Sequence, residues 1–251
     1  MLLRRTGPIA STAWLVLACL AVLLAAGCAP KVLPEPVWEK DARALLSQAD
    51  GLFVKKQYDQ ASKTLDAFLY QYPASKSRDR AFYLMGEVRF IQRDYAKALH
   101  YYKKVIQEFP ASSFIIPARY KLGQCYFELK EYDLAIANLE DRSKIADPAQ
   151  QRRVAEILSV AYAARKDFLR AAKEYAYLAT TAQTDRQKAG YRDRVREIVD
   201  KNLTENELTT LADETAYPAD LARLRLAGIL IEQRQFREAV RIAGGFLETF
   251  P

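Results

Sequence analysis

The stretch DYAKALHYY, Asp94–Tyr102, places an alanine three positions after an aromatic residue. Four other stretches repeat this arrangement: QYDQASKTL, EYDLAIANL, DFLRAAKEY and QFREAVRIA. The five pairs are Tyr58/Ala61, Tyr95/Ala98, Tyr132/Ala135, Phe168/Ala171 and Phe236/Ala239. The aromatic positions 58, 95, 132, 168 and 236 are separated by 37, 37, 36 and 68 residues, and the last interval is twice 34. A period of this length indicates an internal structural repeat.

A small residue precedes each aromatic residue by nine positions. These residues are Ala49, Gly86, Gly123, Ser159 and Ala227. Apolar residues recur at helical spacing on both sides, which predicts two helices that meet in a hairpin just before the aromatic residue. The small residue and the alanine let the two backbones approach closely, and the aromatic ring fills the corner.

Prolines mark the ends of the repeats. Pro73, Pro110, Pro148 and Pro251 follow the aromatic residue by 15 or 16 positions in four of the five copies. Proline lacks an amide donor and disfavours helix in the residue before it, so it ends one helix and opens the next. Ser75, and either Ser112 or Ser113, are then expected as helix N-caps.

The repeats predict an all-α fold, a helical solenoid of about six hairpins. The hairpins are expected at roughly 38–73, 75–110, 112–147, 150–183, 185–216 and 218–251. The fifth is degenerate, because it lacks the aromatic residue and the alanine. There LTENELTTL predicts a new helix start, with Thr204 and Glu207 forming a capping box. An ordinary helical bundle with chance alternation is the alternative, which five stretches in register disfavour.

The first 28 residues predict export. Arg4 and Arg5 precede an uncharged stretch, Ile9–Ala26, and small residues then lead to Cys28. A basic start, an apolar core and small residues before a processing point are typical of a secretory signal peptide, here residues 1–27. The apolar stretch is also near the minimum length of a membrane span, so an uncleaved anchor helix is the alternative.

The composition argues against several kinds of site. Lys and Arg number 38 against 31 Asp and Glu, but the charges are interspersed, so nucleic acid is not an expected partner. One histidine, His100, and one cysteine in the repeats, Cys125, predict neither a metal site nor a disulfide. Cys125 is expected to be a packed core residue. Because no catalytic or nucleotide-binding motif stands out, we expect no cofactor, no small-molecule substrate and no enzymatic activity.

The repeats resemble the tetratricopeptide repeat over nearly all of residues 38–251. Together with YQYPASKSRDRAFYLMGEVRF and QEFPASSFIIPARYKLGQCYF, they look similar to the BamD-like family of outer-membrane lipoproteins, which assemble β-barrel proteins. This resemblance implies a right-handed superhelical solenoid.

The stretch LLAAGCAP, Leu23–Pro30, resembles a bacterial lipobox. The resemblance implies that Cys28 is acylated, with palmitate among its acyl chains, and begins a lipidated linker of residues 28–37. Cys19 fits the same box and is the weaker candidate, because apolar core sequence follows it. Ala29, in place of an aspartate, implies the outer membrane and a protein that faces the periplasm.

The resemblance also implies where partners bind. In such solenoids the first helix of each hairpin lines a concave face that holds peptides. By the family pattern the inner positions are Arg43, Asp50 and Phe53 in the first hairpin, Arg80, Tyr83, Glu87 and Phe90 in the second, and Tyr120, Gln124 and Phe127 in the third. The alternative is that several of these aromatic residues pack between hairpins.

The sequence thus predicts a non-catalytic scaffold that binds protein partners in envelope biogenesis. The resemblance favours outer-membrane protein assembly, with unfolded barrel precursors and other assembly subunits as partners. The amino-terminal domain of a lipoprotein activator of peptidoglycan synthases, or a coordinator of cell division, is the alternative, and a peptidoglycan-acting enzyme is a remote one. The last repeat ends in GGFLETFP without a polar capping helix, so we expect the natural chain to continue past Pro251.

Overall fold

The structure is a computed structural model that describes residues 36–249. The chain divides into two compact units, residues 1–41 and residues 42–251. Of the first unit, residues 36–41 are described, and they contain the first turn of a helix. The predicted signal peptide, with Cys19, and the predicted lipidation site Cys28 lie outside the described residues.

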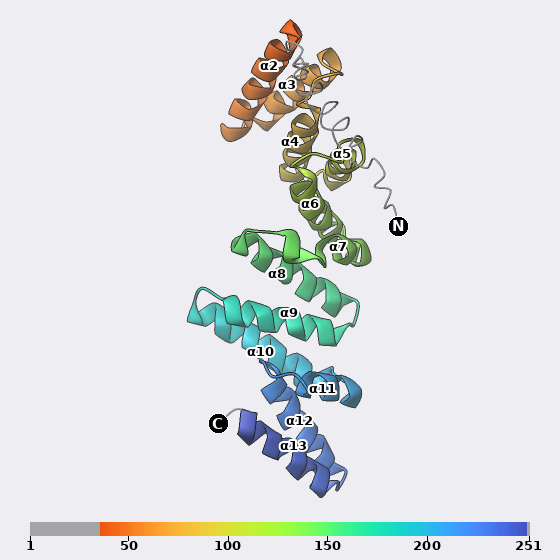
Figure 1. Ribbon diagram of the computed structural model, residues 1–251, viewed down its shortest axis with the longest axis vertical. Coiled ribbons are helices and arrows are strands. Elements are labelled where there is room, and N and C mark those ends of the chain that lie inside the picture. Colours follow the sequence, from red (N-terminus) through yellow and green to blue (C-terminus); the bar gives the residue numbers. More distant parts are fainter. Residues whose placement is uncertain (1–35, 250–251) are drawn as a thin grey trace, which may run out of the picture. The chain divides into compact units, whose positions relative to one another are not determined.

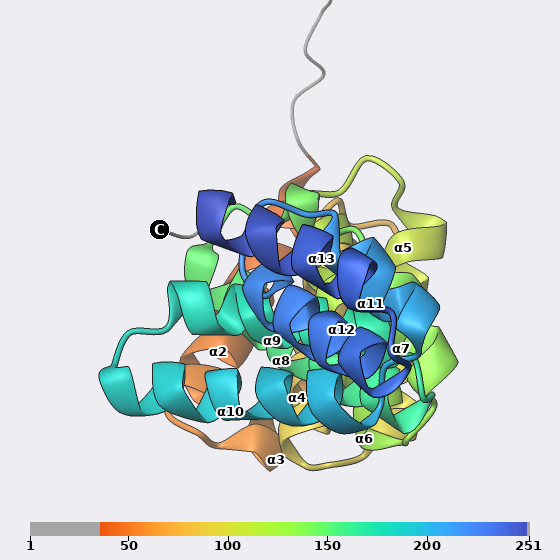
Figure 2. The same ribbon diagram turned by 90° about the horizontal axis from the view of Figure 1, so that it is seen from below.

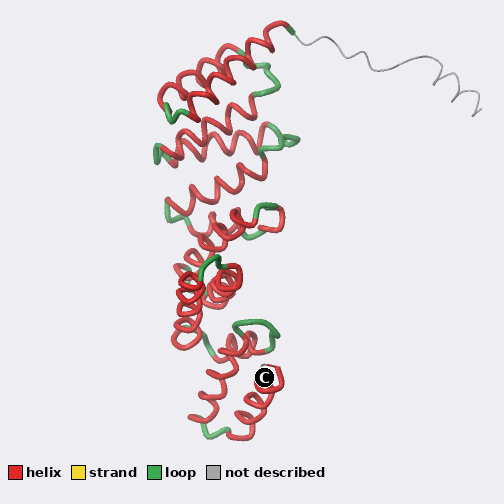
Figure 3. The backbone as a smooth tube through the Cα atoms, turned by 90° about the vertical axis from the view of Figure 1, so that its left-hand side faces the viewer, coloured by secondary structure: helices red, strands yellow, loops and turns green. Residues whose placement is uncertain are grey.

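The described residues form twelve α-helices and one short 3-10 helix, with no β-strand among them (Figures 1 and 3). The α-helices are α2 (Val37–Val54), α3 (Tyr58–Gln71), α4 (Arg78–Ile91), α5 (Tyr95–Glu108), α6 (Ile115–Glu128), α7 (Tyr132–Leu139), α8 (Pro148–Ala164), α9 (Phe168–Thr181), α10 (Asp185–Lys201), α11 (Glu205–Ala212), α12 (Ala219–Glu232) and α13 (Phe236–Thr249). Within residues 42–251 most of them pair into successive hairpins that pack in chain order, but α10 packs closely against α9 and α12 rather than against α11. The predicted all-α solenoid of about six hairpins is therefore confirmed. No helix of residues 36–249 has the length and apolarity needed to cross a membrane.

Five of the hairpin turns share one conformation. In each, the residue two positions before the aromatic residue is left-handed, with φ between 59° and 62°: Lys56, Arg93, Lys130, Lys166 and Arg234. In the first turn the amide of Lys56 donates to Phe53 O and the amide of Gln57 donates to Leu52 O, and the other four turns repeat both bonds. This pair of bonds is a Schellman motif, which satisfies the last carbonyls of the first helix. Glycine is the usual residue at the left-handed position, yet this chain places a cation there each time.

Side-chain caps start several of the helices that follow turns. Asp94 accepts a hydrogen bond from the amide of Lys97 at the start of α5, and Asp167 does the same for Arg170 at the start of α9. Thr204 and Glu207 form a reciprocal capping box at the start of α11, as predicted. These bonds satisfy amides that the first turn of a helix leaves without partners.

Two predicted N-caps are wrong. The N-cap of α4 is Ser77 and the N-cap of α6 is Phe114, so neither Ser75 nor Ser112 or Ser113 holds the position. The hydroxyl oxygen of Ser75 instead accepts from the amide of Ser77, and that of Ser112 accepts from the amide of Phe114. Both serines therefore stabilise the turn that precedes the helix, because their short side chains compete for nearby backbone groups.

The third and last hairpins depart from the pattern. Helix α7 has 8 residues, against 14 in α3 and α5, and the chain then forms the 3-10 helix Arg142–Lys144 before α8 begins. Helices α12 and α13 lie side by side (Figure 2). In this last hairpin the corner residue Phe236 is 59% exposed, whereas the four earlier corner aromatics are half-buried.

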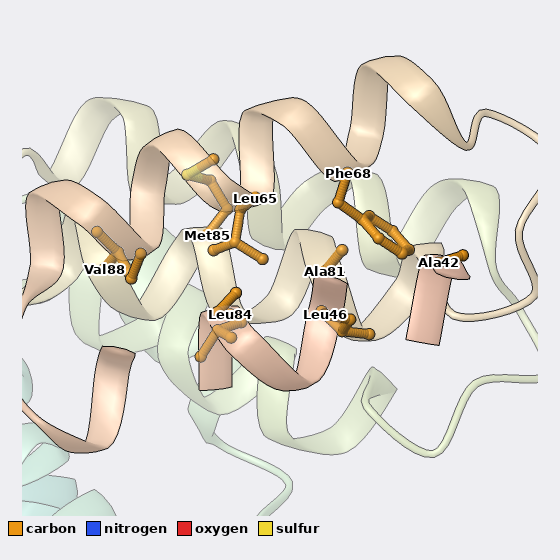
Figure 4. Packing of buried hydrophobic residues seen from close by; sticks show 10 residues of the cluster. Ala42, Leu46, Leu65, Phe68, Ala81, Leu84, Met85 and Val88 are labelled. Carbon is orange, nitrogen blue, oxygen red and sulfur yellow. The ribbon is translucent and has the colours of Figure 1, made fainter. Parts of the chain in front are cut away.

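The core continues from one hairpin to the next. Figure 4 shows the first cluster, in which Ala42 and Leu46 of α2 meet Leu65 and Phe68 of α3 and residues of α4 such as Met85. The next cluster joins α4, α5 and α6, and it contains Cys125, which is fully buried. Burial raises the pKa of the Cys125 thiol to about 12, so this group is a packed and unreactive core residue.

Candidate functional site

The predicted repeat-packing residues lie at the contacts between paired helices. Ala49, Ala61, Ala98, Ala135 and Ala171 are fully buried, and Ala227 and Ala239 are buried to within 8%. Gly86 of α4 faces the ring of Tyr102 on α5, and Gly123 of α6 faces the side chain of Leu139 on α7. The aromatic residues Tyr58, Tyr95, Tyr132 and Phe168 are half-buried at the corners, and Phe236 is the exposed exception.

Three predicted groove residues pack against these corners. Phe53, Phe90 and Phe127 each end a first helix, and each ring meets the corner tyrosine five positions later edge to face. The ring centroids lie 5.6 Å apart for Phe53–Tyr58, 5.5 Å for Phe90–Tyr95 and 6.0 Å for Phe127–Tyr132. The three phenylalanines are half-buried. Part of each ring therefore fixes the hairpin, and the remainder is available at the surface.

A polar cluster links the second and third hairpins. Glu87 accepts a hydrogen bond from the hydroxyl of Tyr102 at 2.5 Å and an ion-paired hydrogen bond from Nζ of Lys121 at 2.8 Å. The Lys121 ammonium also lies 5.0 Å from the ring centroid of Phe90. Burial, followed by the nearby Glu87 carboxylate, raises the pKa of Tyr102 and of Tyr83 well above the usual value for tyrosine. Both phenols therefore remain protonated donors, and the cluster fixes α4 against α5 and α6.

A surface pocket of about 240 Å³ lies beside this cluster and crosses three first helices. Phe90 of α4, Gln124, Phe127 and Glu128 of α6, and Arg153, Glu156 and Ile157 of α8 line it. Phe90, Gln124 and Phe127 are among the ten predicted groove residues, so the structure brings these three together. We call this site the groove pocket.

The fourth hairpin supplies lining residues that the sequence prediction omitted. Arg153 and Glu156 precede Ser159 by six and three positions, as Arg80 and Tyr83 precede Gly86. The same offsets would therefore have found them. Tyr191 of α10, also omitted, donates a hydrogen bond to Glu156 at 2.9 Å and continues the polar surface into the fifth hairpin.

The other predicted groove residues have different roles. Asp50 and Arg80 form an ion pair of 2.6 Å between α2 and α4, and Arg43 is exposed on α2. Tyr83 stacks on Phe114 with ring centroids 5.0 Å apart. Tyr120 is only 7% exposed, because it packs in the core cluster with Leu139 and other residues. It is therefore a core residue and does not line the groove pocket.

The groove pocket can hold one side chain. Small-molecule sites usually enclose about 300–1,000 Å³, so a pocket of about 240 Å³ suits a single side chain of a longer ligand. Two phenylalanine rings offer apolar contact, and the Gln124 amide and the charged rim offer hydrogen bonds. Among residues 36–249 no group of His, Cys, Asp and Glu is arranged to hold a metal ion.

Comparisons with known proteins agree with a repeat protein. The model of the family described as anaphase-promoting complex, cyclosome, subunit 3 matches residues 54–142. No curated protein sequence matches. Among solved structures, the apo form of the quorum sensor NprR from B. thuringiensis has a TM-score of 0.51 at 15% identity over 95% of this chain and 71% of that one. A tetratricopeptide repeat protein from Parabacteroides merdae has a TM-score of 0.50 at 12% identity over 84% of this chain and 80% of that one. The chain thus has the fold of a tetratricopeptide-repeat protein.

Proposed function

We propose that this protein is a non-catalytic, lipid-anchored scaffold of the outer membrane that faces the periplasm and binds extended segments of other proteins. The groove pocket is the observation that carries the proposal. It opens across α4, α6 and α8, the first helices of three consecutive hairpins, and its walls are aromatic. Extended peptides bind helical-repeat surfaces in this way, with side chains in separate pockets along the groove.

The fold supports a role in protein binding. A tetratricopeptide solenoid stacks helix pairs into an extended surface, and the half-buried rings of Phe53, Phe90 and Phe127 are held by the corner tyrosines before any ligand arrives. Rings that are already ordered lose little conformational entropy on binding. Unfolded barrel precursors present extended chain, which a surface of this kind can bind.

The location rests on the sequence LLAAGCAP. Acyl chains on Cys28 would hold the protein at a membrane, since each buried methylene contributes about 0.8 kcal/mol and two or more chains anchor firmly. Together with the BamD-like resemblance of the second and third repeats, this favours a function in outer-membrane protein assembly.

Crosslinking in intact envelopes tests the proposal. The lipidated full-length protein is the bait, the Cys28→Ser variant is the matched control, and mass spectrometry identifies the captured proteins. We expect a β-barrel assembly protein to be captured by the lipidated bait and depleted with the control. Capture of a penicillin-binding synthase or of division proteins instead would indicate a function in cell-wall synthesis and would contradict a function in outer-membrane protein assembly.

A further inference from the structure

The groove pocket carries two carboxylates that take part in no ion pair between described side chains. Glu128 and Glu156 line it, both are exposed, and neither forms an ion pair with a side chain that the structure describes. Other carboxylates of the second to fourth hairpins are ion-paired within the chain. Glu87 pairs with Lys121 at 2.8 Å, Asp133 with Arg165 at 2.7 Å and Glu140 with Arg170 at 3.2 Å. With Arg153 as the one cation among the lining residues, the pocket has a net formal charge of −1 in a chain whose formal net charge is +7.

The one cation that lines the pocket is already engaged. Arg153 hydrogen-bonds the hydroxyl of Tyr120, and its charge lowers the pKa of that phenol against the larger effect of burial, which raises it. Lys121, which lies over Phe90, belongs to the Glu87 ion pair. The phenol of Tyr120 is neutral, so its hydrogen bond leaves the charge of Arg153 in place, and Arg153 offsets one of the two carboxylates of the pocket.

Apart from Arg153, the polar side chains that line the pocket offer acceptor atoms. Nε2 of Gln124 donates to the Tyr120 hydroxyl at 2.7 Å, which leaves Oε1 to accept. Glu156 accepts one hydrogen bond from Tyr191 and Glu128 accepts one from Tyr95, and both carboxylates have further lone pairs. A guanidinium offers five donors and no acceptor, and an ammonium offers three. The aliphatic stem of either side chain packs on aromatic rings, and the charged group is attracted to their faces.

The chain builds the same combination from its own residues one hairpin further on. There the guanidinium of Arg170 lies 4.7 Å from the ring centroid of Tyr162, and it is ion-paired with Glu140 at 3.2 Å and with Asp167 at 2.6 Å. At that place in this chain, an aromatic ring and two carboxylates thus bind an arginine side chain.

We propose that the groove pocket takes an arginine or lysine side chain of the bound segment, held between Phe90 and Phe127 and neutralised by Glu128 and Glu156. This inference rests on the proposed binding of extended segments and names the side chain that the pocket selects. The solenoid therefore discriminates among segments by a basic residue at one position.

Nuclear magnetic resonance titration of the isotope-labelled protein tests the selection. The probes are three blocked pentapeptides with arginine, norleucine or glutamate at the centre of four alanines. We expect the arginine peptide to shift the side-chain amide signals of Gln124 and the backbone amide signals of Phe90 and Phe127. The norleucine peptide should bind more weakly, and the glutamate peptide should cause no shift of these signals. The Glu128→Gln/Glu156→Gln variant keeps the shape of the pocket and should bind the arginine peptide about tenfold more weakly.

The Glu131→Gln/Glu232→Gln variant is the matched control, because it also removes two exposed carboxylates, neither of which lines the pocket. It should bind the arginine peptide like the wild type. The proposal is overturned if norleucine or glutamate binds best, if no peptide shifts these signals, or if the Glu128→Gln/Glu156→Gln variant binds arginine as the wild type does. Preferential binding of norleucine or glutamate at the same signals would leave peptide binding by the groove intact, so the two proposals fail separately.

Discussion

A β-carbon placed on Gly86 of α4 would lie 2.5 Å from Cε1 of Tyr102 on α5. The Tyr102 ring is fully buried, and its hydroxyl is bonded to Glu87, so the ring has no space into which to move. The absent side chain at position 86 is thus what allows this hairpin to close. Gly123 and Leu139 have the same relationship in the third hairpin.

Gly86→Leu should therefore lower the free energy of unfolding by about 2 kcal/mol or more, because overpacking a rigid core forces backbone shifts. Gly51→Leu is the control. A β-carbon on Gly51 meets nothing within 4 Å, so that change should stabilise α2 by about 0.5–1 kcal/mol through helix propensity. Urea denaturation of the three proteins gives both values, and equal midpoints for the two variants would refute the packing described for Gly86.

Lys130→Gly should raise the free energy of unfolding by about 0.5–1 kcal/mol. Left-handed backbone costs a residue with a β-carbon about 1–2 kcal/mol, and the favourable interaction of a cation with the end of α6 offsets part of this cost. Lys63→Gly, at an exposed interior position of α3, should instead cost about 1 kcal/mol. Thermal melting separates the two, and destabilisation by both variants would show that the left-handed turn is unstrained.

Stability should fall at high pH. An unfolded tyrosine loses its proton near pH 10, whereas burial and Glu87 hold the pKa of folded Tyr102 well above that. Because the folded-state pKa is raised, the stabilisation is complete below pH 10 and is lost as the pH rises further. Above pH 10 the loss from Tyr102 should be about 1.4 kcal/mol per pH unit.

Tyr102→Phe removes this titration. The free energy of unfolding of this variant should therefore depend less steeply on pH between 10 and 11 than that of the wild type. The difference between the two slopes should equal the contribution of one tyrosine. Urea titrations at pH 8, 10, 10.5 and 11 measure both slopes. Identical slopes in the two proteins would contradict the assignment of a raised pKa to Tyr102.

Cys28→Ser should abolish lipidation. If Cys28 is the acylated residue, the variant will be neither processed nor labelled when cells grow with radioactive palmitate, and Cys19→Ser, the control, will be labelled like the wild type. Continued labelling of Cys28→Ser would show that the lipobox assignment is wrong.

Much of the fold was predictable because the repeat is strict. The spacing from Ala49 to Tyr58 to Ala61 recurs in each clear copy, and helix periodicity allows only a hairpin between the two helices. The left-handed turns escaped prediction, because Lys56 and its four equivalents carry none of the glycine or asparagine that signals such a backbone. The early end of α7 at Leu139 was missed for a similar reason, since the residues after it contain no proline until Pro148.

The sequence predicted which face of the solenoid carries the site, but not which residues on that face line the pocket. Periodicity places Tyr120 and Gln124 on the same side of α6, but it cannot reveal that Tyr120 is buried by neighbours from other helices while Gln124 lines a pocket. The partner carboxylate of Lys121 was also hidden, because Glu87 is 34 residues away in sequence. Long-range contacts of this kind depend on how the hairpins pack, which the repeat alone does not determine.

Site-specific photo-crosslinking tests whether the groove across α4, α6 and α8 binds protein segments. A benzoyl-phenylalanine replaces Gln124 in the groove pocket or, as the control, Tyr70, which is 87% exposed on α3 and outside the pocket. Both lipidated proteins are irradiated in intact envelopes, and the products are identified by mass spectrometry. We expect discrete protein adducts at position 124 that are missing at position 70. Adducts that are equal at both positions, or found only at position 70, would contradict binding by the groove.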